Sequence, residues 1–256
     1  MVRKDAPRPI DMARLFGPLD EAASLFVAGE YRQVVPILEK LLIEDPHNLD
    51  AALRLATAES ELGHNAKALE AFKRAEALAP DSPDVQTYLG LFYAKGKDWP
   101  LAAPLLERVL AQSPDRLPAL EALAIVRERQ GRIEEAIRLR QKIYTMRTPS
   151  PADLVQLGAL AMEAGQTNVA IDAFEKARSD HELELGVLYL AAGRLQEARD
   201  ALDHVPPGPQ YPMALFKRAQ VSVLLHEADA PSRIASAREH ADATTRPLIE
   251  RERLFR

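Results

Sequence analysis

The sequence contains no cysteine among its 256 residues, which excludes disulfides, thiolate metal sites and cysteine nucleophiles together. Aromatic residues make up only 5% of the chain, and Trp99 is its single tryptophan. Because strands draw on aromatic and β-branched side chains, this scarcity favours close-packed helices over sheets. The lack of cysteine does not decide the compartment, since cytoplasmic and periplasmic proteins can both lack it.

An excess of positive charge is also missing, because 33 basic and 38 acidic residues give a net charge of −5. Nucleic-acid binders carry a basic surface that follows the phosphates, so we expect no nucleic-acid partner. No apolar run approaches the ~20 residues that span a bilayer, so we expect no membrane insertion. The polar, proline-bearing start lacks the apolar stretch of a signal peptide. We interpret residues 1–14 as a linker-like segment, of a soluble protein in the cytoplasm or periplasm.

Signatures of catalysis are absent as well. The chain has no Gly-rich phosphate loop and no Gly-x-Ser-x-Gly elbow. Its histidines are scattered, and none has the spacing of a metal-ligand pair: His47, His64, His181, His204, His226 and His240. We therefore expect a protein that is not an enzyme and that binds neither a metal nor a cofactor.

What the sequence does contain is an internal repeat. Gly29, Gly63, Gly131 and Gly165 follow one another at 34, 68 and 34 residues, and three prolines recur every 34 residues, at Pro46, Pro80 and Pro114. We call this shared interval the repeat length. A glycine ends the first helix of each unit and a proline ends the second. Between them lie apolar residues at helical spacing, and one such helix pair cannot bury its apolar face alone, so neighbouring pairs must stack.

This pattern resembles the tetratricopeptide repeat. The second unit is the best match, with the family's signature residues at Leu55, Ala56, Gly63, Ala68, Phe72, Ala75 and Pro80. In the third unit the glycine is displaced to Gly96, and in the fourth Arg140 replaces the usual aromatic residue. The resemblance implies an all-α fold, a right-handed superhelical α-solenoid of helix-turn-helix repeats.

We assign residues 15–205 to an array of about six repeats. Residues 206–256 form a divergent helical repeat with C-terminal capping helices, which we predict at 212–226, 230–242 and 246–255. The step from Gly165 to Gly193 is only 28 residues, so we expect a local change in pitch there. Ser179 followed by Glu182 resembles a capping box that begins the next helix.

The resemblance also implies a function, because the first helices of such arrays line a concave groove. We predict a protein–protein interaction scaffold that binds a peptide or helix of a partner there. The groove positions carried over to this sequence are Phe26, Leu53, Thr57, Leu91, Lys95, Glu121, Ile125, Arg129, Val155, Met162, Val187 and Leu190. An alternative is that a C-terminal helix of this same chain fills part of the groove.

Two further patterns bear on the partner. The positions that would grip the C-terminal carboxylate of a chaperone tail carry Leu19, Ala23, Arg54, Asp84 and Tyr88, so such a partner is not expected. A basic cluster in the fourth unit is interpreted as a solvated face balanced by neighbouring glutamates: Arg127, Arg129, Arg132, Arg138, Arg140 and Lys142.

Other functions stay open. The start of the chain weakly resembles segments that join bacterial sulfatase-type hydrolase domains to C-terminal tetratricopeptide arrays, so the chain could be the non-catalytic module of a larger enzyme. Stacking of one array on another would instead make it a self-assembling, homo-oligomeric module. The sequence does not identify the partner.

Overall fold

The chain is helical throughout the part that the computed structural model describes, namely residues 9–177 and 181–255, with side chains from Gly17 onward. No strand occurs in these ranges. The helices of the first half are α1 (Pro9–Val27), α2 (Tyr31–Glu44), α3 (Leu49–Glu61), α4 (Asn65–Leu78), α5 (Pro83–Lys95), α6 (Trp99–Gln112), α7 (Leu117–Arg129) and α8 (Ile133–Met146). Those of the second half are α9 (Pro151–Glu163), α10 (Thr167–Ala177), α11 (Glu182–Ala191), α12 (Leu195–Asp203), α13 (Tyr211–Leu224), α14 (Ala230–Glu239), α15 (Arg246–Arg251) and the 3₁₀ helix η1 (Arg253–Phe255).

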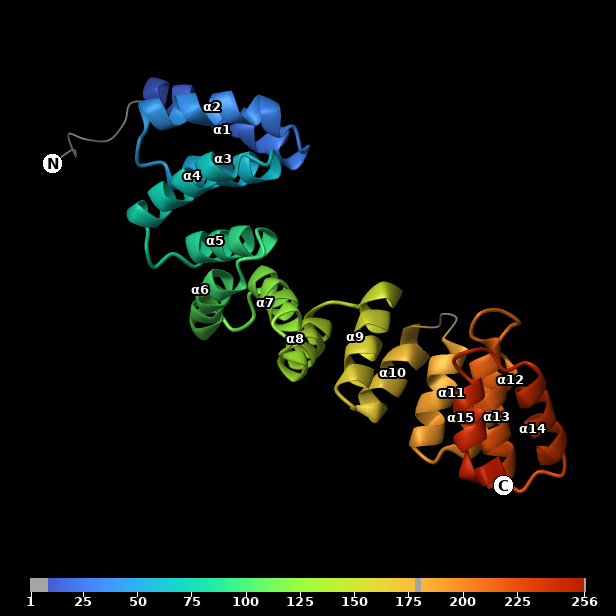
Figure 1. Cartoon of the computed structure of the whole chain (residues 1–256). Coiled ribbons are helices and arrows are strands. Elements are labelled where there is room, and N and C mark those ends of the chain that lie inside the picture. The colour runs from blue at the N-terminus through green and yellow to red at the C-terminus, as the bar shows by residue number, and fades with distance from the viewer. Residues whose placement is uncertain (1–8, 178–180, 256) are drawn as a thin grey trace. The chain divides into compact units, whose positions relative to one another are not determined.

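The helices form two compact units, which we call unit 1 (up to Leu139) and unit 2 (from Arg140), with the boundary inside α8. Within unit 1 helix α1 packs against α2, α3 against α4 and α5 against α6 (Figure 1). The same pairing recurs within unit 2, where α9 packs on α10, α11 on α12 and α13 on α14. This arrangement confirms the predicted all-helical stack of helix-turn-helix repeats.

The turn inside each pair needs a residue in the left-handed backbone conformation. Gly29, Gly63, Gly131, Gly165 and Gly193 all have φ between 68° and 79°. In the third pair this conformation belongs to Lys97, with φ of 62°, while Gly96 has an ordinary helical φ of −73°. The role predicted for Gly96 is therefore wrong. The packing of the two helices requires the left-handed residue at position 97, one repeat length after Gly63. Lys97 adopts this conformation, although it is unfavourable for a residue with a Cβ atom.

A second set of glycines lets the paired helices approach closely. A Cβ atom added at Gly90 would lie 2.8 Å from Leu106, and one at Gly158 would lie 2.8 Å from Phe174. At Gly186 the same atom would lie 2.5 Å from Leu202. In each case the facing residue belongs to the second helix of the same pair. Because these glycines have no side chain, Leu106, Phe174 and Leu202 can pack directly against the backbone of the first helix.

Several predicted boundaries differ from the observed ones. Helix α1 begins at Pro9, so it includes residues 9–14 of the predicted linker, because proline is well suited to the first turn of a helix. Ser179 lies outside the described residues, and α11 begins at Glu182 itself. A capping box does occur at α9, between Ser150 and Asp153. The last predicted helix ends early, at Arg251, because Glu252 is extended.

Candidate interaction surface

In unit 1 the predicted groove positions of consecutive first helices fall into register. Thr57, Leu91 and Ile125 are each one repeat length apart and lie on α3, α5 and α7, and α5 packs against both of the other helices. Thr57 and Leu91 are half-buried, whereas 47% of the Ile125 side chain is exposed. We call these three residues the inner row. Leu91 packs partly against the core residues of α6 and α7, and Ile125 leaves apolar surface exposed on α7.

A charged row runs beside the inner row, one helical turn further along each helix. It consists of Glu61, Lys95 and Arg129, which are also one repeat length apart and all exposed. The Lys95 ammonium lies 2.9 Å from the Glu61 carboxylate and donates a hydrogen bond of 3.3 Å to the Ser60 carbonyl oxygen. The ion pair therefore ties α5 to α3 and orients Lys95 along the edge of the face. Exposed pairs of this kind add little stability, so their role here is mainly positional.

Other predicted groove residues of unit 1 are engaged inside the unit. Leu53 is only 8% exposed and belongs to the hydrophobic core, so a partner could not reach it. Phe26 is half-buried, with its ring 5.5 Å from that of Tyr31 and 5.6 Å from the guanidinium carbon of Arg54. Glu121 is half-buried on α7, one turn before Ile125. The face available in unit 1 is thus narrower than the predicted groove.

Unit 2 presents a more apolar set. Val155 is half-buried and Met162 exposed on α9, and Val187 and Leu190 are half-buried on α11. Here the regular spacing is lost, since Val155 and Val187 lie closer in the sequence than one repeat length. Helix α11 packs against α13, the first helix of the next pair.

Two positions on α13 lie outside the predicted set. The left-handed residue His226 follows Gly193 by just under one repeat length, and the same offset makes Gln220 correspond to Val187 of α11 and Phe216 to Leu183, one turn earlier on α11. Both are covered by the C-terminal residues of this chain. The Phe255 ring lies 5.9 Å from the Phe216 ring, and the Gln220 amide donates a hydrogen bond to the Glu252 carboxylate. The turn residue of this helix pair could have revealed the correspondence, but it is His226, whereas the preceding pair has Gly193.

Comparison with known families identifies the repeat. Tetratricopeptide-repeat models match residues 25–91 and then residues 89–151 and 155–212, which together are well over half of the chain. The chain belongs to the tetratricopeptide-repeat family.

A curated relative is the cellulose synthase operon protein C of Pseudomonas fluorescens (strain SBW25), 29% identical over 199 residues. That match covers 70% of this chain but only 16% of the relative, so the chain spans about a sixth of the relative's length.

Solved structures with a similar fold include MamA of MSR-1, with a TM-score of 0.54 and 28% identity over 64% of this chain and 94% of that one. PilW, a type IV pilus biogenesis factor, aligns over 97% of this chain and 98% of its own, with a TM-score of 0.56. At 17% identity, PilW shares the fold alone.

The basic cluster of the fourth tetratricopeptide repeat is not a solvated face throughout. Arg127 is only 3% exposed and Arg140 is also buried. Arg127 forms ion pairs with Glu107 of α6 and, at 3.0 Å, with Glu135 of α8. The interpretation as a solvated face is therefore wrong for these two arginines. Arg127 joins consecutive repeats, and its partner Glu107 lies too far away in the sequence for helical spacing to reveal it.

Neither a metal site nor a membrane span is found in the described ranges. No group of three or more His, Cys, Asp or Glu side chains there is arranged to hold a metal ion. None of the described helices combines the length and the apolar character needed to cross a membrane. Trp99, at the start of α6, packs against the core of unit 1.

Proposed function

We propose that this protein is a non-catalytic interaction scaffold that binds a peptide or helix of another protein on the inner row of unit 1. The observation that carries the proposal is the register of Thr57, Leu91 and Ile125 on packed consecutive helices. An extended or helical ligand could contact all three at once. Covering the exposed part of Ile125 and its neighbours would contribute roughly 25 cal/mol for each Å² of apolar area removed from water.

Specific binding would need polar contacts beside this apolar strip. The charged row supplies both signs of charge, with Glu61 and Lys95 already held in place by their ion pair. Charges that are ordered before a partner arrives lose less side-chain entropy on binding. The apolar residues of α9 and α11 in unit 2 offer a second contact area of the same kind. The partner's identity does not follow from the similarity to the cellulose synthase operon protein, since this chain matches only 16% of that protein.

The proposal is tested by affinity capture from a lysate of the source organism. A Leu91→Arg, Ile125→Arg variant should lose a protein that the parent chain retains. The matched control is Leu101→Arg, because Leu101 is 48% exposed, as Ile125 is, but lies on the second helix α6. If the control loses the same protein, or the inner-row variant keeps it with its helicity intact, the assignment to the inner row is wrong.

Self-assembly is a second candidate, and a specific cavity favours it. A cavity of about 610 Å³ on the first helix pair is lined by Pro18, Glu21, Pro36, Ile37, Lys40, Leu41 and Glu44. It presents apolar side chains together with charges of both signs, which suits a self-complementary contact between two copies. Light scattering should then give a mass that rises with concentration, and Ile37→Arg should abolish the rise. A role as the module of a sulfatase-type enzyme stays a prediction.

A further inference from the structure

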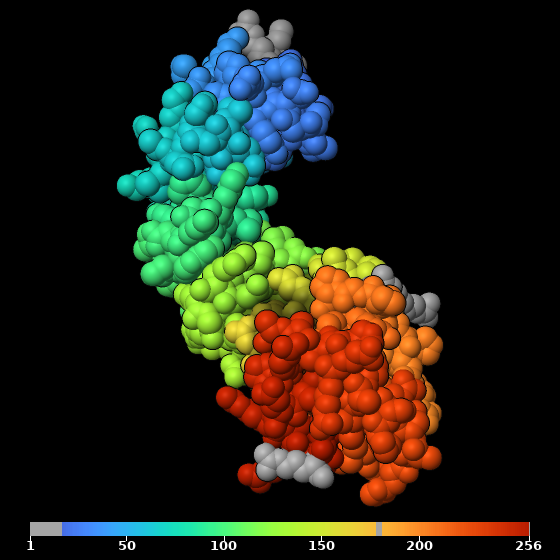
Figure 2. Space-filling view, turned by 45° about the vertical axis from the view of Figure 1, so that its right-hand side comes forward, coloured from blue at the N-terminus to red at the C-terminus, as the bar shows by residue number. Residues whose placement is uncertain are grey.

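A cavity of about 450 Å³ lies between the second and third helix pairs of unit 1. Residues of the α3–α4 turn line one side of it, and Phe92, Tyr93 and Asp98 line the other side, around the α5–α6 turn. We call it the Tyr93 cavity. Figure 2 shows these two helix pairs, in cyan and green, directly against each other. Glu61 and Lys95 of the charged row also line the cavity, so it adjoins the face proposed above.

Unit 2 contains a tyrosine at the equivalent position, which shows what such a site can hold. Tyr93 of α5 and Tyr189 of α11 each lie four positions before the left-handed residue of their turn. The residue after the left-handed one is Asp98 in unit 1 and Arg194 in unit 2. In both turns its backbone N–H donates a hydrogen bond of 2.8 Å to the tyrosine carbonyl oxygen. Asp98 and Arg194 therefore occupy corresponding positions beside the two tyrosines.

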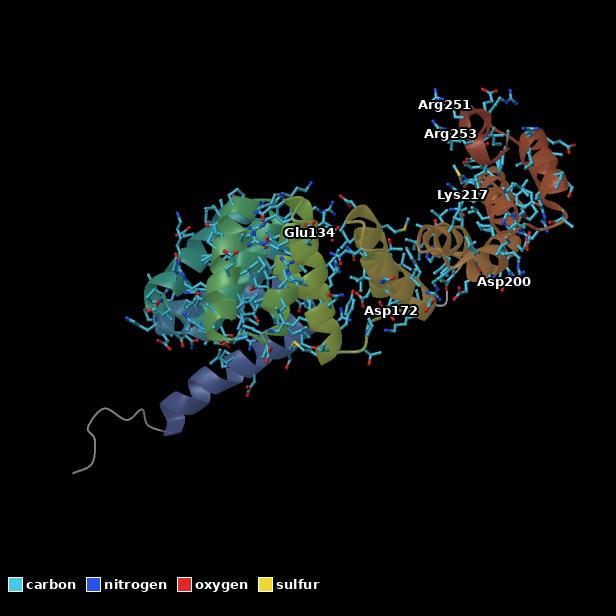
Figure 3. The ribbon with its side chains drawn as sticks, turned by 90° about the horizontal axis from the view of Figure 1, so that it is seen from below. Glu134, Asp172, Asp200, Lys217, Arg251 and Arg253 are labelled. Atoms are coloured by element: carbon cyan, nitrogen blue, oxygen red, sulfur yellow. The ribbon has the colours of Figure 1, made fainter. Side chains whose placement is uncertain are left out.

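In unit 2 the chain itself supplies a cation to this site. The guanidinium carbon of Arg194 lies 4.5 Å from the centre of the Tyr189 ring. The same guanidinium pairs with Glu197 at 2.7 Å and lies 3.6 Å from Glu175. In Figure 3, Asp172 marks α10, the helix that supplies Glu175. Attraction between a cation and an aromatic face stabilises such a contact, and the neighbouring carboxylates strengthen it.

Among the described residues, the Tyr93 cavity has the ring and the negative charge but no cation over the ring. Asp98 stands where Arg194 stands in unit 2, and it is exposed, with no ion pair to any residue that the structure describes. Burial raises the pKa of the Tyr93 hydroxyl, and the nearby negative charges of Asp98 and of Glu76 on α4 raise it further. The surroundings of this ring therefore favour a positive charge.

The lysine in the cavity wall is already engaged. The Lys95 ammonium lies 2.9 Å from the Glu61 carboxylate and donates a hydrogen bond to a backbone carbonyl of α3. Since Glu61 and Lys95 balance each other, Asp98 leaves the lining with one net negative charge. Phe92 and Tyr93 add aromatic surface, with ring centroids 5.6 Å apart. An aromatic wall beside a carboxylate favours a guanidinium, which is planar and binds both kinds of group.

From these contacts we infer that the Tyr93 cavity binds an arginine side chain of a partner protein, with the guanidinium against the aromatic wall and paired with Asp98. The inference rests on the proposed function in one respect, because the partner's apolar residues would lie on the adjoining inner row. None of the three inner-row residues lines the cavity, so either assignment can fail while the other stands.

The experiment is an NMR titration of the full chain, isotope-labelled in its tyrosine rings, with N-acetylargininamide as the probe. N-acetylcitrullinamide has nearly the same shape without the charge, and serves as the matched control at equal chloride concentration. We expect the arginine probe to shift the Tyr93 ring signals, which the variant Tyr93→Phe assigns, along a saturating curve. It should bind at least about tenfold more tightly than the citrulline probe, because only a cation is attracted to the ring and to Asp98. Equal binding of the two probes, or no shift at Tyr93, would overturn the inference.

Two variants exchange the character of the two sites. Asp98→Arg gives unit 1 the residue that unit 2 has, and the Asp98 side chain makes no cap on α6 that the change would remove. This variant should hold its own cation over Tyr93 and bind the arginine probe at least about tenfold more weakly than the parent chain, because the site is then free for less of the time. Arg194→Ala should have the opposite effect in unit 2, where the probe should then shift the Tyr189 signals.

Asp98→Asn keeps the size of the side chain and removes its charge, so it replaces Asp98→Arg if that variant loses helicity. It should weaken binding of the arginine probe by about tenfold. Unchanged binding in a folded Asp98 variant overturns the inference. The probe has no apolar side chain, so its binding does not depend on the inner row. A protein that the parent chain and Asp98→Arg capture equally well from a lysate would show that the partner does not use the cavity.

Discussion

The turns of unit 1 fall at Gly29, Gly63, Lys97 and Gly131, at a constant interval of one repeat length, and its second helices α2, α4 and α6 each contain 14 residues. In unit 2 the step from Gly165 to Gly193 is clearly shorter, and the step on to His226 falls just below one repeat length. Helices α10 and α12 contain 11 and 9 residues. The shorter second helices have fewer turns with which to cover the core.

The difference in turn spacing affects how equivalent residues line up in the two units. Constant spacing in unit 1 keeps Thr57, Leu91 and Ile125 in one row and leaves that face open. In unit 2 the buried Arg218 pairs with Asp203 of α12 at 2.9 Å and with Glu227 at 2.7 Å, much as the buried Arg127 of unit 1 pairs with Glu107 and Glu135. Phe255 and Glu252, near the end of the chain, contact Phe216 and Gln220 of α13. Constant spacing thus keeps equivalent positions of unit 1 in one row, whereas the shorter steps of unit 2 offset them from one another.

The largest expected effect comes from placing a charge in each core. Leu89 in unit 1 and Leu157 in unit 2 are both buried. An unpaired buried lysine at either position should cost more than about 4 kcal/mol. We expect Leu89→Lys to remove hydrogen-exchange protection first from unit 1, and Leu157→Lys first from unit 2, because each repeat depends on its neighbours.

The matched controls are Leu101→Lys and Met162→Lys, at exposed residues of units 1 and 2. Both should keep the thermal melting curve of the parent chain. If Leu89→Lys and Leu157→Lys melt as the parent does, the repeat register is wrong. If each removes protection from both units at the same rate, the division into two units has no counterpart in stability.

The next largest effect on stability is expected at the closely packed glycines, where the two units should differ. A Cβ atom at Gly186 would lie 2.5 Å from Cγ of Leu202, whereas one at Gly90 would lie 2.8 Å from a terminal methyl of Leu106. We expect Gly186→Ala and Gly90→Ala each to lower the free energy of unfolding by about 1–3 kcal/mol, with the larger loss at Gly186. Urea denaturation measures both.

Gly208→Ala is the control, since nothing lies within 4 Å of a Cβ atom there. Its effect should stay within about 0.5 kcal/mol. A double variant with Leu202→Ala should recover part of the Gly186→Ala loss, because the smaller side chain leaves room. Equal losses at Gly208 and Gly186 would show that close approach to Leu202 does not govern the effect at Gly186.

These packing sites were largely predictable from the sequence, because a constant repeat length fixes which residues face each other. The same regularity made Leu53 look like a groove residue, although it is buried in the core of unit 1. Periodicity predicts the direction in which a side chain points but not how deeply it is buried. The burial of Arg127 and the covering of Phe216 depend on residues distant in sequence, Glu107 and Phe255, and no local pattern predicts such contacts.

A pH-dependent contribution is expected in unit 2. The Asp153 carboxylate accepts a hydrogen bond from Arg147 at 2.9 Å and closes the capping box with Ser150, and these contacts lower its pKa to about 2. A carboxyl with a depressed pKa in the folded state stabilises above its unfolded pKa of about 3.9, and this stability is lost as the pH falls toward 2. Since Arg147 is about one-third exposed, solvent screening reduces the contribution to roughly 1 kcal/mol.

Asp153→Asn should therefore lower the free energy of unfolding at pH 7, and its difference from the parent should shrink between pH 5 and pH 2. Ser82→Ala in unit 1 is the comparison, because the Ser82 cap of α5 has no ionisable partner at the third helical position. Its loss of about 1 kcal/mol should not depend on pH. Urea denaturation at pH 7, 4 and 2.5 checks both variants. A constant Asp153→Asn loss across this range would rule out the carboxylate as the source.

The smallest expected effect concerns Lys97. Among the described turns of unit 1, this is the left-handed position that is not occupied by glycine. Its φ of 62° is strained for a lysine, whereas glycine adopts it freely. Lys97→Gly should raise the free energy of unfolding by about 0.5–1 kcal/mol, since relief of strain exceeds the entropy that glycine adds to the unfolded chain. Gly193→Lys in unit 2 should lower the free energy of unfolding by a similar amount, because it introduces the same backbone strain that Lys97→Gly removes. Lys97→Ala is the matched control: it removes the charge but keeps the Cβ atom, so it should leave stability unchanged. If alanine stabilises as much as glycine does, the lysine charge, and not the backbone, limits this turn.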